Sequence, residues 1–315
     1  MFNSIQLVFA DMCGGPGGFT EFLFWKRNLS GKKSLGFGLT LKGNQDYKLE
    51  SMLLADIADS FEPHYGADGS GNILKTRNID AFVSHVLRKT ESRGVDLVLA
   101  DGAFSILGDE MNQEEHSIQI VLCQVLAMFQ LLKARGSFLL KCFDLTSPVS
   151  VQILYLLYTH FERIAIVKPL TSRPANGERF ILCENLRIPF PKPLIEHLRK
   201  VNDRMNDLKP PPATSDTAVV KSAHVAHQPG FMPREEKILL GLEEVTDIID
   251  RDFVLSDKKF KSFLYGSNLR LAVKQRNALE EILKYASDGN KERFNQIEVR
   301  DRCLRHWNLP IANLN

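Results

Sequence analysis

Three charged residues, Asp101, Lys141 and Glu178, lie at or near the ends of apolar runs that are expected to form strands. Lys141 stands inside such a run. Burying an unpaired ammonium there is costly, so this lysine needs a carboxylate or a ligand beside it. Two interpretations follow. Lys141 forms a structural ion pair with Asp101 or Asp144, or it takes a proton in a reaction at the carboxyl edge of the sheet, where open α/β folds bind ligands.

A glycine-rich turn at residues 13–18 joins the apolar run at 5–10 to a helix that Thr20 is expected to cap. Glycines let a ligand approach the backbone closely, and the helix N-terminus offers unpaired amide donors. The spacing matches neither the dinucleotide pattern nor a P-loop, and Pro16 removes an amide that a pyrophosphate would need. The turn therefore favours a ligand held by its ribose and amino-acid ends, such as S-adenosylmethionine, over a tight turn without a ligand.

Methyl transfer from such a donor to a hydroxyl group is one reaction in which Lys141 could take part. Such a transfer is an in-line displacement at the sulfonium methyl, and the enzyme must align both partners and help to remove the hydroxyl proton. A lysine serves as the base when burial or a second cation lowers its pKa, whereas neighbouring carboxylates raise it. The sequence supplies carboxylates at 101 and 178 but no obvious second cation.

The elements that position these residues alternate between strands and helices. Strands are expected at 5–10, 34–41, 95–100, 137–143, 163–167 and 179–183, with helices at 79–89, 114–132 and 149–159 and a loop over 60–76. This alternation predicts a mostly parallel sheet covered by helices on both faces. The loop between the last two strands is too short for a parallel crossover, which predicts an antiparallel hairpin at the sheet's end.

Beyond residue 190 the chain becomes helical and charged. Helices are expected at 194–208, 235–247 and 269–285, separated in part by a proline-rich linker at 209–216. We therefore expect one α/β domain at residues 1–190 and a helical C-terminal extension at 191–315, either packed on the core or linked to it.

Composition excludes several classes of protein. The chain has 315 residues and a net charge of +2, too mild to indicate a partner. Its five cysteines lack the spacing of a disulfide framework or a zinc site, so no metal is expected. Neither a signal peptide nor an apolar run long enough to span a membrane is found, so membrane insertion is not expected.

Several strings taken together resemble one known family, the cap-specific mRNA 2′-O-ribose methyltransferases of the FtsJ-like class. The matching strings are residues 13–19, 41–43, 100–102, 140–144 and 171–179, in the family's order. The resemblance implies a Rossmann-like methyltransferase fold with S-adenosylmethionine as cofactor. It also implies methylation of the first transcribed nucleotide of capped mRNA in the nucleus, with RNA polymerase II or other capping machinery as partners.

The same resemblance assigns roles to residues. The family uses a Lys-Asp-Lys-Glu tetrad, of which Asp101, Lys141 and Glu178 would be the last three members, with Lys141 as the base. The cofactor-binding residues would be Cys13, Gly14, Gly15, Pro16, Gly17, Gly18, Phe19, Asn72, Ile73 and Asp101. The capped RNA would be contacted by Met111, Asn112, Gln113, Arg173 and Asn176.

One departure from the family lies before the glycine turn. The family's first tetrad lysine lies on a helix upstream of this turn, whereas residues 1–12 contain neither Lys nor Arg, so we expect an N-terminally truncated form. Without that lysine, the carboxylates would hold the proton on Lys141. Two alternatives therefore stay open: a cofactor-binding but catalytically impaired RNA-binding fragment, and an FtsJ-like 2′-O-methyltransferase of another RNA. A dehydrogenase is disfavoured, because the dinucleotide glycine pattern is missing.

Overall fold

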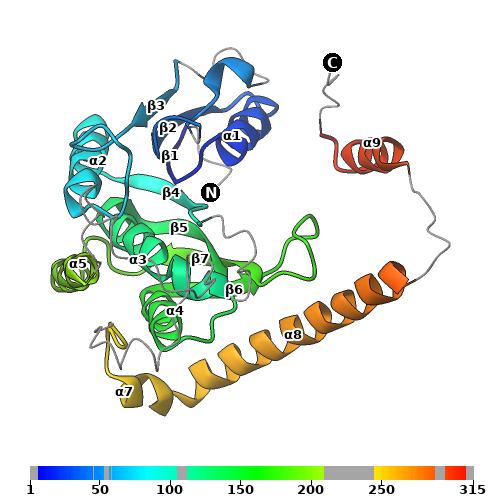
Figure 1. The fold of residues 1–315 in the computed structure, drawn as a ribbon. Helices are drawn as coiled ribbons and strands as arrows, with labels where there is room; N and C mark the ends of the chain where they lie inside the picture. The colour runs from blue at the N-terminus through cyan, green and yellow to red at the C-terminus, as the bar shows by residue number, and fades with distance from the viewer. Residues whose placement is uncertain are drawn as a thin grey trace, which may run out of the picture.

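A seven-stranded sheet forms the centre of the computed structural model, which describes residues 6–44, 46–52, 57, 59–104, 112–208, 245–287 and 295–309 (Figure 1). The strand order is β3-β2-β1-β4-β5-β7-β6. The strands are β1 (Gln6–Met12), β2 (Lys33–Leu39), β3 (Phe61–His64), β4 (Val95–Ala100), β5 (Leu132–Phe143), β6 (Phe161–Val167) and β7 (Glu178–Leu186). The first five strands pair in parallel, and β7 pairs antiparallel with both β5 and β6. The predicted parallel sheet and terminal hairpin are confirmed.

The strand order reverses between β1 and β4, which are neighbours in space although two strands separate them in the chain. Met12 and Ala100 are partners in this pair, so the residues that follow each strand emerge side by side at the carboxyl edge. A reversal of this kind opens a crevice that serves as the ligand site in open α/β sheets. The fold therefore brings the glycine turn and Asp101 to one place.

Helices cover both faces of the sheet. A large apolar cluster joins one face to α2, α3 and α4, and a smaller cluster joins the other face to α1 through Phe9, Phe24 and Phe61. The helices are α1 (Gly18–Asn28), α2 (Thr76–Lys89), α3 (Gln113–Leu131), α4 (Pro148–His160), α5 (Lys192–Asp207), α7 (Arg251–Ser256), α8 (Lys258–Ser287) and α9 (Gln296–His306), with a 3-10 turn, η1 (Leu49–Ser51).

Three local expectations need correction or fall outside the described residues. The loop expected over 60–76 contains the short strand β3, which carries Pro63 and has no apolar run to mark it. Thr20 does not cap α1, because the helix begins earlier, at Gly18, with Gly17 as its N-cap. The helix expected at 235–247 falls mostly outside the residues that the structure describes, and its last three residues are not helical.

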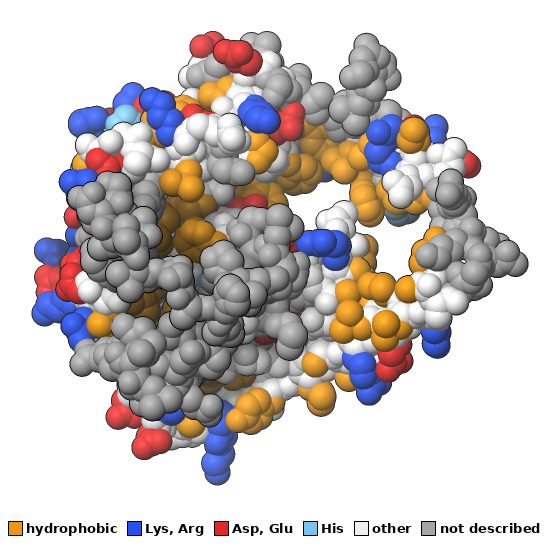
Figure 2. Space-filling model, viewed as in Figure 1, with side chains coloured by type: hydrophobic (Ala, Val, Ile, Leu, Met, Phe, Trp, Pro, Cys, Tyr) orange, Lys and Arg blue, Asp and Glu red, His pale blue; other side chains and the backbone are white. Residues whose placement is uncertain are grey.

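The C-terminal elements contact the core at several points. On α5, Asn202 donates to the carbonyl of Leu74, and Arg199 pairs with Asp80 of α2. Phe260, near the start of α8, packs edge-on against Tyr155 of α4. From there α8 runs out beyond the body of the molecule (Figure 1) and carries apolar side chains on the side that faces the body (Figure 2). The division into domains at residue 190 stays a prediction.

Among the helices described, none combines the length and the apolar character needed to cross a bilayer.

Candidate active site

The glycine turn makes a tight corner between β1 and α1. Gly17 has a φ of 115°, in the left-handed region that favours glycine, and its amide donates to the carbonyl of Gly14. The amide of Cys13 donates to the carbonyl of Leu39, which ties the corner to the end of β2. A methyl group added at Gly18 would meet no atom within 4 Å, so the corner is open beside the N-terminus of α1.

Asp11 lies buried beneath this corner. Its Oδ2 accepts a 2.7 Å hydrogen bond from Thr20, and its backbone carbonyl accepts one from Tyr47. A Cβ at Gly14 would collide with the Asp11 carboxyl group, so only glycine fits above it. Burial raises the pKa of Asp11 to about 7, the Thr20 hydrogen bond opposes this, and the charge of Asp101 adds to it. Asp11 directly follows the apolar run at 5–10, and no spacing signal in the sequence indicated that its carboxyl group would be buried beneath the glycine turn.

Lys141 pairs with Asp101, which decides between the partners left open by the sequence. Lys141 Nζ lies 3.1 Å from Asp101 Oδ1, and the lysine side chain is 13% exposed. The Asp101 amide donates to the carbonyl of Met12, so the pair lies directly beside the glycine corner. Asp144 instead pairs with Arg179 at 2.8 Å.

Glu178 completes the predicted trio from the start of β7. Phe143 is its cross-strand partner and Lys141 is the partner of Phe180, so Lys141 and Glu178 are diagonal neighbours on one face of the sheet. Such neighbours lie roughly 7–8 Å apart. Burial raises the pKa of Asp101, Lys141 lowers it, and the Glu178 charge raises it again. The structure therefore brings Asp101, Lys141 and Glu178 together.

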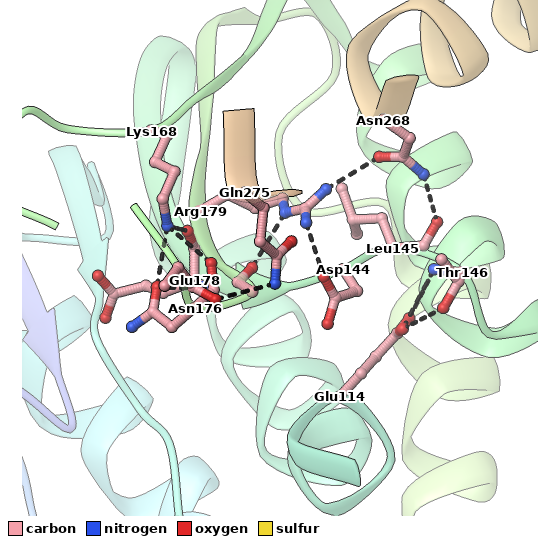
Figure 3. A network of polar contacts seen from close by, with 12 residues as sticks. Glu114, Asp144, Leu145, Thr146, Lys168, Asn176, Glu178, Arg179, Asn268 and Gln275 are labelled. Atoms are coloured by element: carbon pink, nitrogen blue, oxygen red, sulfur yellow. Dashed lines mark hydrogen bonds and ion pairs between the residues drawn. The ribbon is translucent and has the colours of Figure 1, made fainter. Parts of the chain in front are cut away.

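The loop between β6 and β7 is held by Lys168, a candidate phosphate contact when judged by its charge alone. Its ammonium donates to the backbone carbonyl and side-chain oxygen of Asn176 and to the carbonyl of Glu178, at 3.0, 2.9 and 2.6 Å (Figure 3). Ser172 donates to Glu178 Oε1 at 2.6 Å. Asn176 is thus part of the scaffold that orients Glu178, whereas Arg173 is exposed on the same loop.

Arg179 joins this loop to α8. Its guanidinium is buried and donates to Asp144, to Asn268 of α8 and to the carbonyl of Gly177 (Figure 3). Gln275, about two turns further along α8, donates to the carbonyl of Ala175. The C-terminal extension is therefore bonded to the loop that carries Glu178, a link that no sequence pattern predicted.

Asn72 and Ile73 lie on the loop between β3 and α2. Asn72 Oδ1 accepts from the amide of Leu74, and the Ile73 side chain is buried in the larger apolar cluster. Gly71 is packed so closely on the Thr40 carbonyl that a Cβ would collide with it, and Thr40 Oγ1 accepts from the amide of Gly15. Thr40 thus connects this loop with the glycine corner.

The remaining predicted RNA contacts lie at the start of α3. Asn112 is the N-cap of this helix, Gln113 is its first residue, and Met111 lies outside the described residues. The neighbouring Glu114, which the sequence did not single out, accepts from the amides of Thr146 and Ser147 (Figure 3). It fixes the loop after β5 to the start of α3.

The comparison with protein families decides the class. The model described as FtsJ-like methyltransferase matches residues 2–186. The chain belongs to the FtsJ-like methyltransferase family. The matched part of this FtsJ-like chain contains the glycine corner, the Lys141–Asp101 pair and Glu178.

Individual relatives of this FtsJ-like methyltransferase carry a narrower name. The Xenopus laevis "Cap-specific mRNA (nucleoside-2'-O-)-methyltransferase 1" is 36% identical over 98% of this chain, and the Dictyostelium discoideum protein of the same name is 33% identical over 96%. The chain spans 33% and 37% of these relatives' own lengths. Among solved structures, a putative ribosomal RNA methyltransferase from Plasmodium falciparum aligns with 57% of this chain and 86% of its own, at 17% identity and a TM-score of 0.39.

The corner fits the methyl donor expected from the sequence. It stands at the reversal point of the sheet, is open beside Gly18, and lies at the start of a helix whose first amides lack helical partners. The residues that would hold S-adenosylmethionine there are the corner at 13–19 and Asp101, with Asn72 and Ile73 on the far side of Thr40.

Proposed function

We propose that this chain transfers a methyl group from S-adenosylmethionine to the ribose 2′-hydroxyl of the first transcribed nucleotide of capped mRNA. The observation that carries the proposal is the 3.1 Å contact of Lys141 with Asp101 beside the open glycine corner. The names of relatives at 36% identity over nearly the whole chain support the choice of acceptor. The nuclear site of action and partners such as RNA polymerase II or other capping machinery belong to the same proposal.

The residues divide the reaction between them. S-adenosylmethionine, held by the corner at 13–19, would supply an electrophilic methyl group, and a thioether would remain. Lys141 Nζ accepts the proton of the ribose 2′-hydroxyl while the hydroxyl oxygen bonds to the methyl carbon. Asp101 holds the lysine in position. Glu178, fixed by Ser172, faces the same space from β7 and orients the ribose. The net products are the methyl ether, the thioether and one proton.

The capped RNA approaches from the two loops that flank Lys141. Asn112 and Gln113 stand at the start of α3, and Arg173 and Asn176 stand on the β6–β7 loop. Arg173 is exposed, so its guanidinium can contact an RNA phosphate. The side chain of Asn176 instead accepts a hydrogen bond from Lys168. We assign Asn176 an indirect role, in which it keeps the loop and Glu178 in place.

One observation favours a second candidate, cofactor binding with little turnover. Lys141 Nζ is in contact with the Asp101 carboxylate, and Glu178 lies diagonal to it on the same face of the sheet. A lysine that is held in a structural ion pair of this kind can keep the site together and bind RNA without removing a proton.

Transfer of a labelled methyl group tests both candidates. Purified chain is given labelled cofactor with capped RNA, the same RNA without a cap, or ribosomal RNA, and cofactor affinity is measured separately by calorimetry. Selective labelling of capped RNA at the first nucleotide supports the proposal. Stronger labelling of ribosomal RNA would identify ribosomal RNA, and not capped mRNA, as the acceptor. Cofactor binding without labelling of any RNA supports the second candidate.

A further inference from the structure

A groove lies between the end of β6 and the first half of α8, next to the candidate active site but outside it. It has a volume of about 640 Å³ and is lined by residues 166–168 on one wall and by α8 residues between Ser267 and Lys274 on the other. Figure 1 shows α8 passing beside β6 before it leaves the body of the molecule. We call this feature the β6–α8 groove.

The charge of the β6–α8 groove has one sign. Lys168, Arg270 and Lys274 line it, and none of the described residues in its lining is acidic. Arg270 and Lys274 are one turn apart on an exposed part of α8, so both side chains reach the same stretch of the groove. Apolar side chains, including Val167 and Leu269, make up much of the rest. A groove that combines cationic and apolar side chains suits a nucleic-acid strand, which carries negative phosphates and flat bases.

The groove opens at the edge of the sheet where the candidate active site lies. Phe180 of β7 is the cross-strand partner of both Lys141 and Val167. Two strand spacings, about 10 Å, therefore separate Lys141 from Val167 in the groove wall. Lys168 links the two places directly, because it lines the groove and donates to the carbonyl of Glu178. An RNA strand that enters the candidate active site therefore reaches the β6–α8 groove within a short distance.

The far wall of the groove has a fixed position. Asn268 bonds to Arg179 and to the carbonyl of Leu145, and Gln275 bonds to the carbonyl of Ala175 (Figure 3). These two residues lie on either side of the groove residues from Leu269 to Lys274. The helix therefore presents Arg270 and Lys274 at a set distance from the loop that carries Glu178.

We propose that the β6–α8 groove binds the sugar–phosphate backbone of the acceptor RNA outside the methylated nucleotide, with Arg270 and Lys274 as the phosphate contacts. This assignment rests on the proposed function, since it gives the acceptor strand a path away from Lys141. Lys168, whose ammonium is held by the loop, contributes fixed positive charge, and Val167 and Leu269 offer apolar surface to a base or ribose.

Binding of a fluorescent single-stranded RNA to the full chain tests the groove without requiring catalysis. Affinity is measured between roughly 50 and 200 mM salt for wild type, for the Arg270→Gln/Lys274→Gln variant, and for a control, Arg276→Gln/Lys284→Gln, on α8 outside the groove lining. Each phosphate of a single strand that a cation neutralises adds roughly 0.7 to the salt slope, so the slope should be about 1.4 smaller in the groove variant, with severalfold weaker binding. The decrease in the control should be less than half of this.

Unchanged affinity and salt slope in the groove variant would overturn the proposal and leave the groove to another occupant, such as a peptide that adds to the edge strand β6. A second measurement separates this failure from failure of the proposed function. The ratio of KM for a long capped RNA to KM for a capped dinucleotide should rise severalfold in the groove variant. If wild type methylates neither acceptor, the proposed function fails, while the binding result still decides the groove.

Discussion

Thr20, in the first turn of α1, donates a 2.7 Å hydrogen bond to the fully buried carboxyl group of Asp11 on β1. This contact lies under the glycine corner, and the second carboxyl oxygen, Oδ1, has no hydrogen-bond partner among the described residues. Asp11 therefore makes the stability of the corner depend on pH.

Replacing Asp11 with Asn should flatten the pH dependence of unfolding. The pKa of Asp11 is raised to about 7 by burial, so the folded state binds more protons than the unfolded state between pH values of about 4 and 7. The stabilisation from the neutral carboxyl is complete below this window and is lost as the pH rises through about 7. A shift of this size corresponds to at most roughly 4 kcal/mol. Denaturant unfolding of both proteins from pH 5 to 8 measures it, and equal pH slopes would contradict it.

Thr20→Val should have the opposite effect to Asp11→Asn. The Thr20 hydrogen bond lowers the pKa of Asp11, so its loss raises that pKa further and weakens the fold most above neutral pH. Thr20→Ser keeps the hydroxyl donor and is the matched control. The prediction fails if Thr20→Val and Thr20→Ser show the same loss of stability at pH 8.

Gly14→Ala and Gly18→Ala should separate folding from cofactor binding. A Cβ at Gly14 meets the Asp11 carboxyl group, and overpacking of this kind costs about 1–3 kcal/mol. A Cβ at Gly18 meets no atom, and alanine suits a helix better than glycine, so stability should hold or rise. If the cofactor occupies the open corner, Gly18→Ala should weaken its binding. Thermal unfolding and calorimetry with S-adenosylmethionine test both statements, and unchanged cofactor affinity in a stable Gly18→Ala protein would argue against the proposed cofactor position.

Lys141→Met should lower kcat for methyl transfer by about 10²–10⁴, the usual contribution of a general base. Cofactor affinity should change much less, because the corner at 13–19 is left intact. Lys133→Met is a suitable control, since Lys133 lies at the opposite end of β5 and pairs with Asp96. Single-turnover assays at saturating cofactor measure the effect. Equal rates for the Lys141 and Lys133 variants would remove Lys141 from the mechanism.

Arg179→Met should destabilise the protein by about 3 kcal/mol, because it leaves Asp144 without its partner and breaks the bond to Asn268. This figure is at the lower end for a buried pair, since Asp144 is 34% exposed. Asn268→Ala keeps the Arg179–Asp144 pair but loses the bonds of Asn268 to Arg179 and to the Leu145 carbonyl, and it should cost about 2 kcal/mol. Hydrogen exchange should be faster at residues 171–178 in the Arg179 variant. Additive losses in the double variant would show that the two residues act separately.

The sequence alone determined the fold class and the location of the ligand corner. Apolar runs alternating with helical periodicity required a mostly parallel sheet, and a loop too short for a crossover required the antiparallel β6–β7 hairpin. The glycines at 14–18 signalled close approach by a ligand, and the isolated Lys141 signalled a charge that needs a partner. These features are local in the chain, so spacing and residue type were enough to reveal them.

The tertiary structure alone decided which charges meet. The sequence left Asp101 and Asp144 as possible partners of Lys141. Lys141 pairs with Asp101 because β4 lies beside β5, whereas Asp144 pairs with Arg179. The attachment of α8 through Asn268 joins residues that are 89 positions apart in the chain. The burial of Asp11 under Gly14 and the hold of Lys168 on the Glu178 loop join residues that are nearer in the chain, but they too depend on how the chain folds back on itself. Ion pairs and buried hydrogen bonds depend on distances of a few ångströms, and those distances exist only after the strands and helices have packed together.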